Sequence, residues 1–216
     1  MENKGTKTIL FGQESDFASV FQKRASGDIA LDQFSVPGSS LGFIHEHSCE
    51  TGEHEIGFAI VALRRKGETN EDFADYKLRR VAGGRQTQVG LAFSDTWSPV
   101  DSVNVTAKLR ADWFRDDQGI RKKWKISNGE IRENETFPAH EDLAFGGSLA
   151  LNKELSESFN ARASVRSHVR RPTLNELYRP YRVGSFQVAA NESLETERIT
   201  GVELGLDWDA SERLSA

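Results

Sequence analysis

Apolar and polar residues alternate along much of this chain, and the alternation is most regular in its second half. From Val103 to Trp113 every odd-numbered residue is apolar, while the even-numbered residues between them are Asn, Thr, Lys, Arg and Asp. The same period of two runs through residues 56–62, 89–97, 143–151, 159–169 and 202–208. A period of two places successive side chains on opposite faces of a β-strand. The pattern therefore predicts an all-β, antiparallel protein with one apolar face and one charged face.

The segments between these predicted strands alternate in length. Short polar breaks are expected near residues 49–54, 98–101, 152–157 and 209–213, and long excursions over residues 66–84, 118–141 and 171–197. The middle excursion contains Asn128-Gly129 between Ile126 and Ile131, which is the strongest short hairpin signal in the chain. We therefore expect strands that run on beyond a membrane and turn at that tip. Short turns at one end and long loops at the other are the layout of a transmembrane β-barrel.

Three tryptophans bear on the same question. Trp97, Trp113 and Trp208 fall on the apolar face at the expected ends of strands, where membrane barrels carry a girdle of aromatic residues. The same residues would also serve as core residues of a soluble β-sandwich. The charged face is equally ambiguous, because it would meet bulk water in a sandwich and line a polar lumen in a barrel. The pattern alone leaves both architectures open.

Composition narrows the choice among membrane proteins. Charged residues make up 28% of the 216 residues, and the longest apolar stretch, Phe58–Leu63, is far shorter than a membrane helix. A net charge of -5 without a basic block argues against nucleic acid as a partner, and a single cysteine, Cys49, excludes an internal disulfide framework. The first residues contain no apolar segment of a signal peptide, and the last ones form no finishing element. We therefore expect a fragment of a longer chain.

Towards the C-terminal end the chain reads Arg170-Arg171-Pro172-Thr173-Leu174-Asn175-Glu176-Leu177-Tyr178. This stretch resembles a motif of TonB-dependent receptors of the bacterial outer membrane. In that family a strand ends in an aromatic-Arg-Ala-Pro element, which is followed by a Glu-Leu-Tyr segment. Here Val169 stands in place of the aromatic residue and Arg171 in place of the alanine. The residues that carry the resemblance are Arg170, Pro172, Asn175, Glu176, Leu177 and Tyr178.

A second element follows in the order that the family has. Asn191, Leu194 and Glu197 resemble the family's Asn-Pro-x-Leu-x-x-Glu, with Glu192 in place of the proline. Residues 201–208 resemble the family's next strand, in which Glu203 would face the lumen. The resemblance is strong over residues 83–208 and weaker, though compatible, before them. The substitutions indicate a divergent member of the family.

The resemblance implies a 22-stranded transmembrane barrel with an N-terminal plug domain, short periplasmic turns and long extracellular loops. Residues 1–216 would form a partial barrel domain of about eight or nine strands without the plug. It further implies the outer membrane as location, with membrane lipid as a partner and the TonB complex acting through the missing plug. The ligand would be a small molecule or metal chelate, such as a siderophore–iron complex or cobalamin. No histidine lies between Pro172 and Leu194, which disfavours haem, and no cofactor is expected.

The charged face has two interpretations. Its cations would attract an anionic ligand through the lumen, or they would pair with Asp112, Glu203 and Asp207 and with acidic groups of a plug. The second interpretation is favoured, because charged lumens are usual in plugged barrels. The charged residues expected to face the lumen are Lys108, Arg110, Arg162, Arg166 and Glu203. The residues expected to face lipid are Val105, Leu109, Leu149, Leu151, Val165, Leu204 and Leu206.

The long segment after Arg170 holds the predicted ligand contacts. Arg179, Tyr181 and Arg182 are expected in an external loop, where binding residues of receptors concentrate. Residues 173–178 have the pattern of one helical turn, with Thr173 and Glu176 spaced as a capping box.

Other residue groups are weaker candidates for chemistry. His45, His47 and Cys49 would share one face of a strand as a possible metal set, but a polar turn at the periplasmic rim is favoured, so no metal site is predicted. No nucleophile–base pair or phosphate loop calls for catalysis, and His168, the candidate for a phospholipase-like site, falls on the polar face. We therefore expect no enzyme. The rival is a soluble or cell-surface all-β ligand-binding module, in which Val105 and Leu109 would pack against a second sheet.

Overall fold

The computed structural model describes residues 2–183, 186–211 and 214–215, with side chains over residues 5–181 and 186–208. One short helix, α1 (Leu174–Tyr178), lies among the described residues; all other regular structure is β. The strands are β1 (Glu2–Ser15), β2 (Ser19–Gln22), β3 (Ile29–Ser35), β4 (Gly38–Thr51), β5 (His54–Phe73), β6 (Leu78–Val100), β7 (Val103–Lys125), β8 (Ile131–Phe137), β9 (His140–Ser156), β10 (Phe159–Arg170), β11 (Tyr181–Val183), β12 (Phe186–Val188), β13 (Glu197–Ser211) and β14 (Leu214–Ser215).

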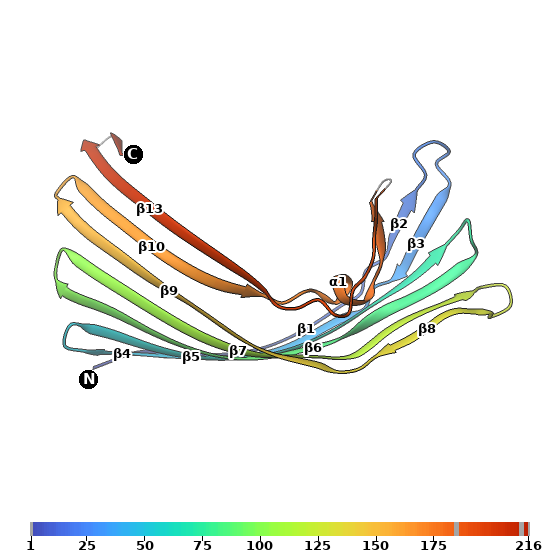
Figure 1. Cartoon of the computed structure of the whole chain (residues 1–216), viewed down its shortest axis with the longest axis horizontal. Helices are drawn as coiled ribbons and strands as arrows, with labels where there is room; N and C mark the ends of the chain where they lie inside the picture. The colour runs from blue at the N-terminus through green and yellow to red at the C-terminus, as the bar shows by residue number, and fades with distance from the viewer. Residues whose placement is uncertain (1, 184–185, 212–213, 216) are drawn as a thin grey trace.

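All the described strands except β11 and β12 form one curved antiparallel sheet that stays open along two edges (Figure 1), and β11 and β12 form a separate two-stranded sheet. Its order is β1-β4-β5-β6-β7-β9-β10-β13-β14, with β2–β3 joined to β5 and β8 joined to β7. Because neighbours along the chain are neighbours in the sheet, the wall is an up-and-down meander, as in barrels. The long strands β1, β4, β5, β6, β7, β9, β10 and β13 agree with the predicted eight or nine, so the predicted fold class is confirmed. No helix among the described residues is long and apolar enough to cross a bilayer.

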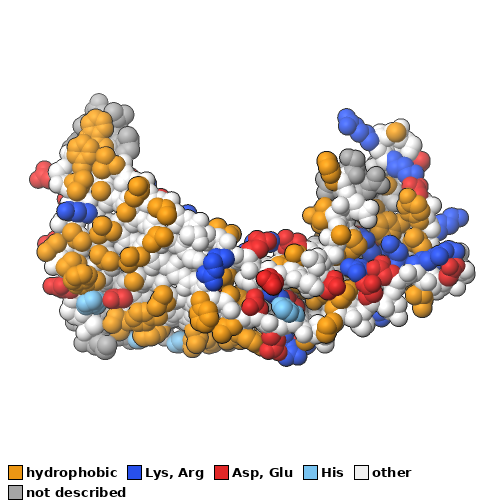
Figure 2. Space-filling model, in the orientation of Figure 1, with side chains coloured by type: hydrophobic (Ala, Val, Ile, Leu, Met, Phe, Trp, Pro, Cys, Tyr) orange, Lys and Arg blue, Asp and Glu red, His pale blue; other side chains and the backbone are white. Residues whose placement is uncertain are grey.

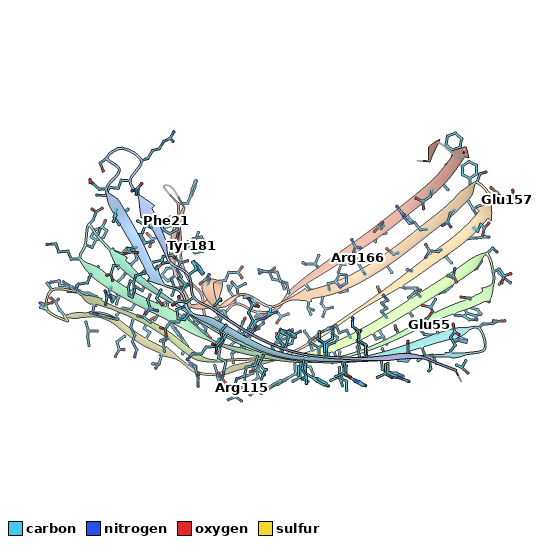
Figure 3. The ribbon with its side chains drawn as sticks, turned by 180° about the vertical axis from the view of Figure 1, so that it is seen from behind. Phe21, Glu55, Arg115, Glu157, Arg166 and Tyr181 are labelled. Atoms are coloured by element: carbon cyan, nitrogen blue, oxygen red, sulfur yellow. The ribbon has the colours of Figure 1, made fainter. Side chains whose placement is uncertain are left out.

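The two ends of the strands differ as the sequence predicted. Successive strands are joined by two-residue turns at one end, at residues 52–53, 101–102 and 157–158, which we call the short-turn end. At the other, the long-loop end, β6 and β7 extend far beyond the apolar pattern. The hairpin predicted at Asn128-Gly129 is confirmed there: it joins β7 to β8, and Gly129 has a positive φ of 72°. Figure 3 shows Glu55 and Glu157 at the short-turn end and Phe21 and Tyr181 at the long-loop end.

The convex face carries a continuous apolar band. One row of directly paired residues crosses five strands, from Trp97 through Val105, Leu151 and Ala163 to Leu204. On this face Leu109 is 66% exposed and Leu204 80% exposed, and within the described residues no second sheet covers them. A soluble sandwich would bury such residues, whereas a lipid-facing wall exposes them. The closed core that the rival interpretation requires is therefore not found in the described part of the chain.

The apolar band has the height of a bilayer core. In β7 it runs from Val103 to Trp113, which is roughly 33 Å along the strand, or about 24 Å across a bilayer at the usual tilt of about 45°. Beyond Trp113 the convex face becomes charged, beginning with Arg115, which points away from the concave side in Figure 3. Trp97 and Trp208 lie near strand ends as predicted, but Trp113 lies in the middle of β7. The prediction of a strand end at Trp113 was wrong, because the strand continues in polar residues beyond the band.

The core of the chain lies against the concave face. The largest fully buried side chains include Leu177 and Pro172 of the segment after β10, together with the charged residues Glu71, Asp112 and Asp116 of the wall. Glu71 and Asp116 bind the segment between β10 and β13 where it folds back onto the inside of the sheet, whereas Asp112 is paired within the wall (Figure 1). We call that segment, residues 171–196, the inner strap.

Candidate functional site

The inner strap packs α1 against the concave face of β6 and β7. The aromatic ring of Tyr178 is 2% exposed and stacks on Phe137 at 5.2 Å between ring centroids. The helical part of the predicted loop therefore folds back onto the concave wall. Leu177 and Tyr178 pack on the wall because burial removes their apolar surface from water. The ribbon β11–β12 rises beside them at the long-loop end (Figure 1).

Two glycines make the slot that holds Tyr178. A Cβ atom placed on Gly84 would lie 2.8 Å from the Tyr178 ring, and one on Gly119 would lie 2.6 Å from it. Real Cβ atoms do not approach carbon this closely, so both positions need the absence of a side chain. Burial beside Asp116 raises the pKa of the Tyr178 hydroxyl to about 12. The ring therefore acts as a neutral packing element against the wall.

The predicted capping box closes the N-terminus of α1. The backbone N–H of Glu176 donates to the Thr173 hydroxyl at 3.3 Å, and the backbone N–H of Thr173 donates to the Glu176 carboxylate at 2.7 Å. Arg170 also donates to both Glu176 oxygens, at 3.0 and 3.1 Å. These hydrogen bonds, that of Arg170 first, lower the pKa of the Glu176 carboxyl to about 2. The family-motif residues Arg170 and Glu176 thus fix where the strap leaves β10.

Arg171, which stands where the family has alanine, forms a buried ion pair with the wall. Its guanidinium donates to the Asp116 carboxylate, with Nε at 2.9 Å from Oδ2, and both side chains are buried. Gln86 donates to Asp116 at 2.9 Å and to the Pro172 carbonyl at 2.8 Å. A buried carboxylate is stable only when it is paired and hydrogen-bonded. Arg171, which departs from the family pattern, therefore has a buried partner on β7.

Arg179 is bound to a second buried carboxylate. Its Nε donates to Glu71 Oε1 at 2.9 Å, and Glu71 is fully buried. Arg80 donates to the other Glu71 oxygen at 2.8 Å, and Gln33 donates to Oε1 at 2.8 Å. Since its charge is already engaged, Arg179 holds the strap to β5 in this structure, and a direct contact with ligand remains a prediction.

The other two predicted ligand contacts lie in the ribbon β11–β12. Tyr181 is 37% exposed and pairs with Val188 across the ribbon. The side chain of Arg182 lies outside the described residues. Further motif residues close the strap: the backbone N–H of Asn191 donates to the Glu176 carbonyl at 3.0 Å, and that of Leu194 donates to the Asn191 carbonyl at 3.3 Å. Of the predicted ligand contacts whose side chains are described, Tyr181 is therefore the one that is accessible to solvent.

The predicted lumen-facing charges lie on the concave face, which the alternation places opposite the apolar band. Arg110 donates to Asp112 at 2.7 Å through Nη2, and Arg162 lies 3.4 Å from Asp207. Arg166 lies 3.6 Å from Glu203. The pairs expected within the wall are thus present. An open hollow of about 860 Å³ lies over Lys108, Arg110 and His168 on this face.

The histidines of β4 lie within the strand, and the turn that follows is only residues 52–53. His45 hydrogen-bonds Thr8 and His47 hydrogen-bonds Thr6, each at 2.9 Å, and Cys49 is buried. The interpretation as a polar turn was therefore wrong for these residues, since alternation continues through them on the convex face. Across the described residues no group of three or more His, Cys, Asp or Glu side chains is arranged to hold a metal ion.

The predictions from the sequence did not identify the wall residues that hold the strap. Glu71 and Asp116 are charged residues in strands, and alternation alone predicts that such residues face solvent or a lumen. Gly84 and Gly119 gave no sign of a slot, because glycines are common in strand interiors of every kind. A signal that was available is the polar sequence on both sides of the residue 74–77 turn, where Glu71 and Arg80 pair directly across β5 and β6.

Comparisons with known proteins agree with this architecture. Residues 11–216 match the family described as TonB dependent receptor-like, beta-barrel. The copper transporter OprC has a similar structure, with a TM-score of 0.73 and 15% identity over 97% of this chain and 34% of that one. The ferric yersiniabactin uptake receptor FyuA from Yersinia pestis matches with a TM-score of 0.65 and 12% identity, over 95% of this chain and 31% of that one. Among curated proteins no sequence match was found.

This chain thus spans about a third of the length of the two solved proteins that it matches. At these identities the structural likeness shows the fold, while the family match covers nearly the whole chain. The curved open sheet, the apolar band and the strap motif agree with it. The chain belongs to the family of TonB-dependent receptor β-barrels, which are outer-membrane receptors and transporters and not enzymes.

Proposed function

We propose that this chain forms about a third of the barrel wall of an outer-membrane receptor that takes up a scarce ligand with energy from TonB. The observation that carries the proposal is the continuous apolar band on the convex face, opposite a concave face of paired charges. A wall with this division has lipid on one side and a polar lumen on the other. Open sheet edges are unfavourable in lipid, so the remaining strands come from the rest of the receptor.

The rest of the receptor also supplies the plug, and the TonB complex acts on that plug. The charged concave wall supports this part of the proposal, since the exposed Lys108 lines its hollow and offers a cation to an inserted domain. The ligand is a metal chelate or cobalamin. Copper joins the possible cargoes, because a solved protein of similar fold is a copper transporter.

Disrupting the gene that encodes this chain in its native host tests the proposal. Uptake of radiolabelled ferric siderophores, copper and cobalamin is measured in parental and disrupted cells, with and without a protonophore. We expect uptake of one ligand class to fall to background in disrupted cells and to stop with the protonophore in parental cells. Unchanged uptake of all three classes under limiting supply would contradict the proposal.

A further inference from the structure

Two histidines lie within the apolar band on the convex face of β4. His45 follows the apolar Phe43 on this face. His47 precedes the buried Cys49, and the residues opposite both histidines on β5 are apolar. His47 is five residues from the turn at residues 52–53, which is roughly 17 Å along the strand, or about 12 Å across a bilayer at the usual tilt of about 45°. Both imidazoles therefore lie well inside the hydrocarbon region, where lipid offers no hydrogen bond.

Each of these imidazoles has one nitrogen bound to the wall. The Nδ1 atom of His45 hydrogen-bonds the Thr8 hydroxyl, and that of His47 hydrogen-bonds the Thr6 hydroxyl, each at 2.9 Å. Within the described residues neither Nε2 atom has a partner. A threonine hydroxyl both donates and accepts, so it supports either tautomer of the ring. Each Nε2 can therefore present a donor or an acceptor to a neighbouring molecule.

A carboxylate–imidazole pair lies on the same convex face, nearer the short-turn end. The Nδ1 atom of His54 is 3.0 Å from an oxygen of Asp95, and the His54 ring stacks on Trp97. Asp95 itself stands between Trp97 and Phe93 on this face of β6. The side chains of His54 and Asp95 are 43% and 29% exposed, so the wall alone does not shield the pair. Contact of such a pair with acyl chains is unfavourable.

These polar groups are confined to one side of the wall. On β7, β9 and β10 the convex face carries no ionisable side chain over residues 103–113, 143–151 and 161–169. Figure 2 shows His side chains among hydrophobic ones along the lower, convex edge of the molecule, in the half that holds the short-turn end. We call the polar residues of this part of the face the polar sector; they are Thr6, Thr8, His45, His47, His54 and Asp95.

We propose that the polar sector is the contact between two copies of the receptor, side by side in the membrane. A protein neighbour supplies the hydrogen bonds that lipid does not. The chemistry of the sector matches itself: an imidazole of one copy donates to an imidazole of the other, and His54 Nε2 of each copy donates to Asp95 of the other. A twofold axis along the membrane normal brings equal heights of both copies together, so the contact is isologous. The inference goes beyond ligand uptake and requires only that the convex face lies in a bilayer.

Chemical cross-linking in isolated outer membranes tests where two copies meet. The full receptor carries Cys49→Ser, to remove the native thiol, and one new cysteine on the convex face. Phe58→Cys, which pairs directly with His47 and is 53% exposed, should give a product of twice the receptor mass with bismaleimidoethane. The matched control is Val202→Cys on β13, which is 75% exposed in the apolar band and should remain monomeric.

The affinity between copies tests the part played by the imidazoles. The dimer dissociation constant is measured in phospholipid vesicles by energy transfer between labelled receptors. His45→Leu combined with His47→Leu should raise it about tenfold, as expected for the loss of hydrogen bonds between membrane segments. The free energy of unfolding should not fall, because leucine suits lipid. The control His168→Leu, on the concave face, should leave the dissociation constant unchanged.

Three results would overturn the inference. The first is equal cross-linking of Phe58→Cys and Val202→Cys, or none of either. The second is a cross-linked product whose mass shows a different protein, since the sector would then bind another partner. The third is a dissociation constant that the two leucines leave unchanged. Energised uptake that persists in the separated copies would leave the proposed function standing.

Discussion

Replacing Gly119 by alanine should destabilise the protein, although the same change in most strands is neutral or favourable. The backbone at Gly119 is outside the left-handed region, so alanine fits the conformation and would normally stabilise by roughly 0.4–1 kcal/mol through the unfolded state. Here the new Cβ would lie 2.6 Å from two ring carbons of Tyr178. Forcing a methyl group into a closely packed site costs about 1–3 kcal/mol. We therefore expect a net loss of free energy of unfolding of about 1–2 kcal/mol.

A double-mutant cycle isolates the slot from other effects. Tyr178→Ala alone should cost about 3–5 kcal/mol, because a nearly fully buried aromatic ring is lost. In that background the ring is gone, so Gly119→Ala should become neutral or slightly stabilising. The coupling free energy between the two sites is then about 1–3 kcal/mol.

Urea unfolding of the purified receptor in phospholipid vesicles, followed by tryptophan fluorescence, measures these differences. Gly12→Ala is the matched control, since a Cβ there meets only the Ser40 carbonyl at 4.0 Å. If Gly119→Ala were as mild as the control, or if its effect were the same with and without Tyr178, the packing of the strap on β6 and β7 would be refuted.

Three further changes probe the wall, the buried cluster and the cap. Leu109→Arg places a charge near the middle of the apolar band and should lower the free energy of unfolding in vesicles by about 2–4 kcal/mol, whereas Lys108→Leu on the opposite face should change it little. Equal effects of the two changes in the urea titration would argue against a lipid-facing band. Glu71→Gln leaves the guanidiniums of Arg80 and Arg179 without their carboxylate, so the free energy of unfolding should fall by about 3–5 kcal/mol and amide hydrogen exchange in the strap should increase. Unaltered exchange would rule out anchoring of the strap by Glu71. The Glu176 carboxyl, with its pKa held near 2 against an ordinary 4.5, contributes stability that is complete above pH 4.5 and is lost as the pH falls towards 2; a midpoint near 4.5 in a carbon-13 NMR titration of that carboxyl would disprove the ion pair.

The faces of the strands could be predicted residue by residue where one face is apolar. In β7 the alternation from Val103 to Trp113 gave the correct division between convex and concave sides, because a half-buried or lipid-facing strand must alternate. The hairpin at Asn128-Gly129 and the capping box of Thr173 and Glu176 were also predicted, since both depend on local backbone chemistry that a short stretch of sequence determines.

The upper half of the wall could not be predicted in this way. Residues 66–84 were expected as a long excursion, yet β5 and β6 stay paired up to Phe73 and Leu78. Above the apolar band both faces of these strands are polar, with the pair Glu71–Arg80 inside and Asp72–Arg79 outside, so the period of two leaves no trace in hydrophobicity.

The candidate site depended on contacts between distant parts of the chain. Arg179 and Glu71 are 108 positions apart, and no local pattern reports that they meet. The same holds for Tyr178 and its two glycines. The sequence motifs indicated that the segment after Arg170 has a functional role. Which wall residues bind that segment depends on the register of the strands in the sheet, and no motif reports that register.

The strap has a consequence for the order in which the protein assembles. Arg171 and Arg179 reach carboxylates 55 and 108 positions earlier in the chain, on β7 and β5. Those partners are brought together only after β5, β6 and β7 have paired, and contacts of such long sequence separation form late in folding. Until then the strap arginines and Glu71 can remain hydrated. A strand paired one residue out of register would turn its own carboxylate or slot glycine to the lipid side, so Tyr178, Arg171 and Arg179 all find their partners only on a correctly paired wall.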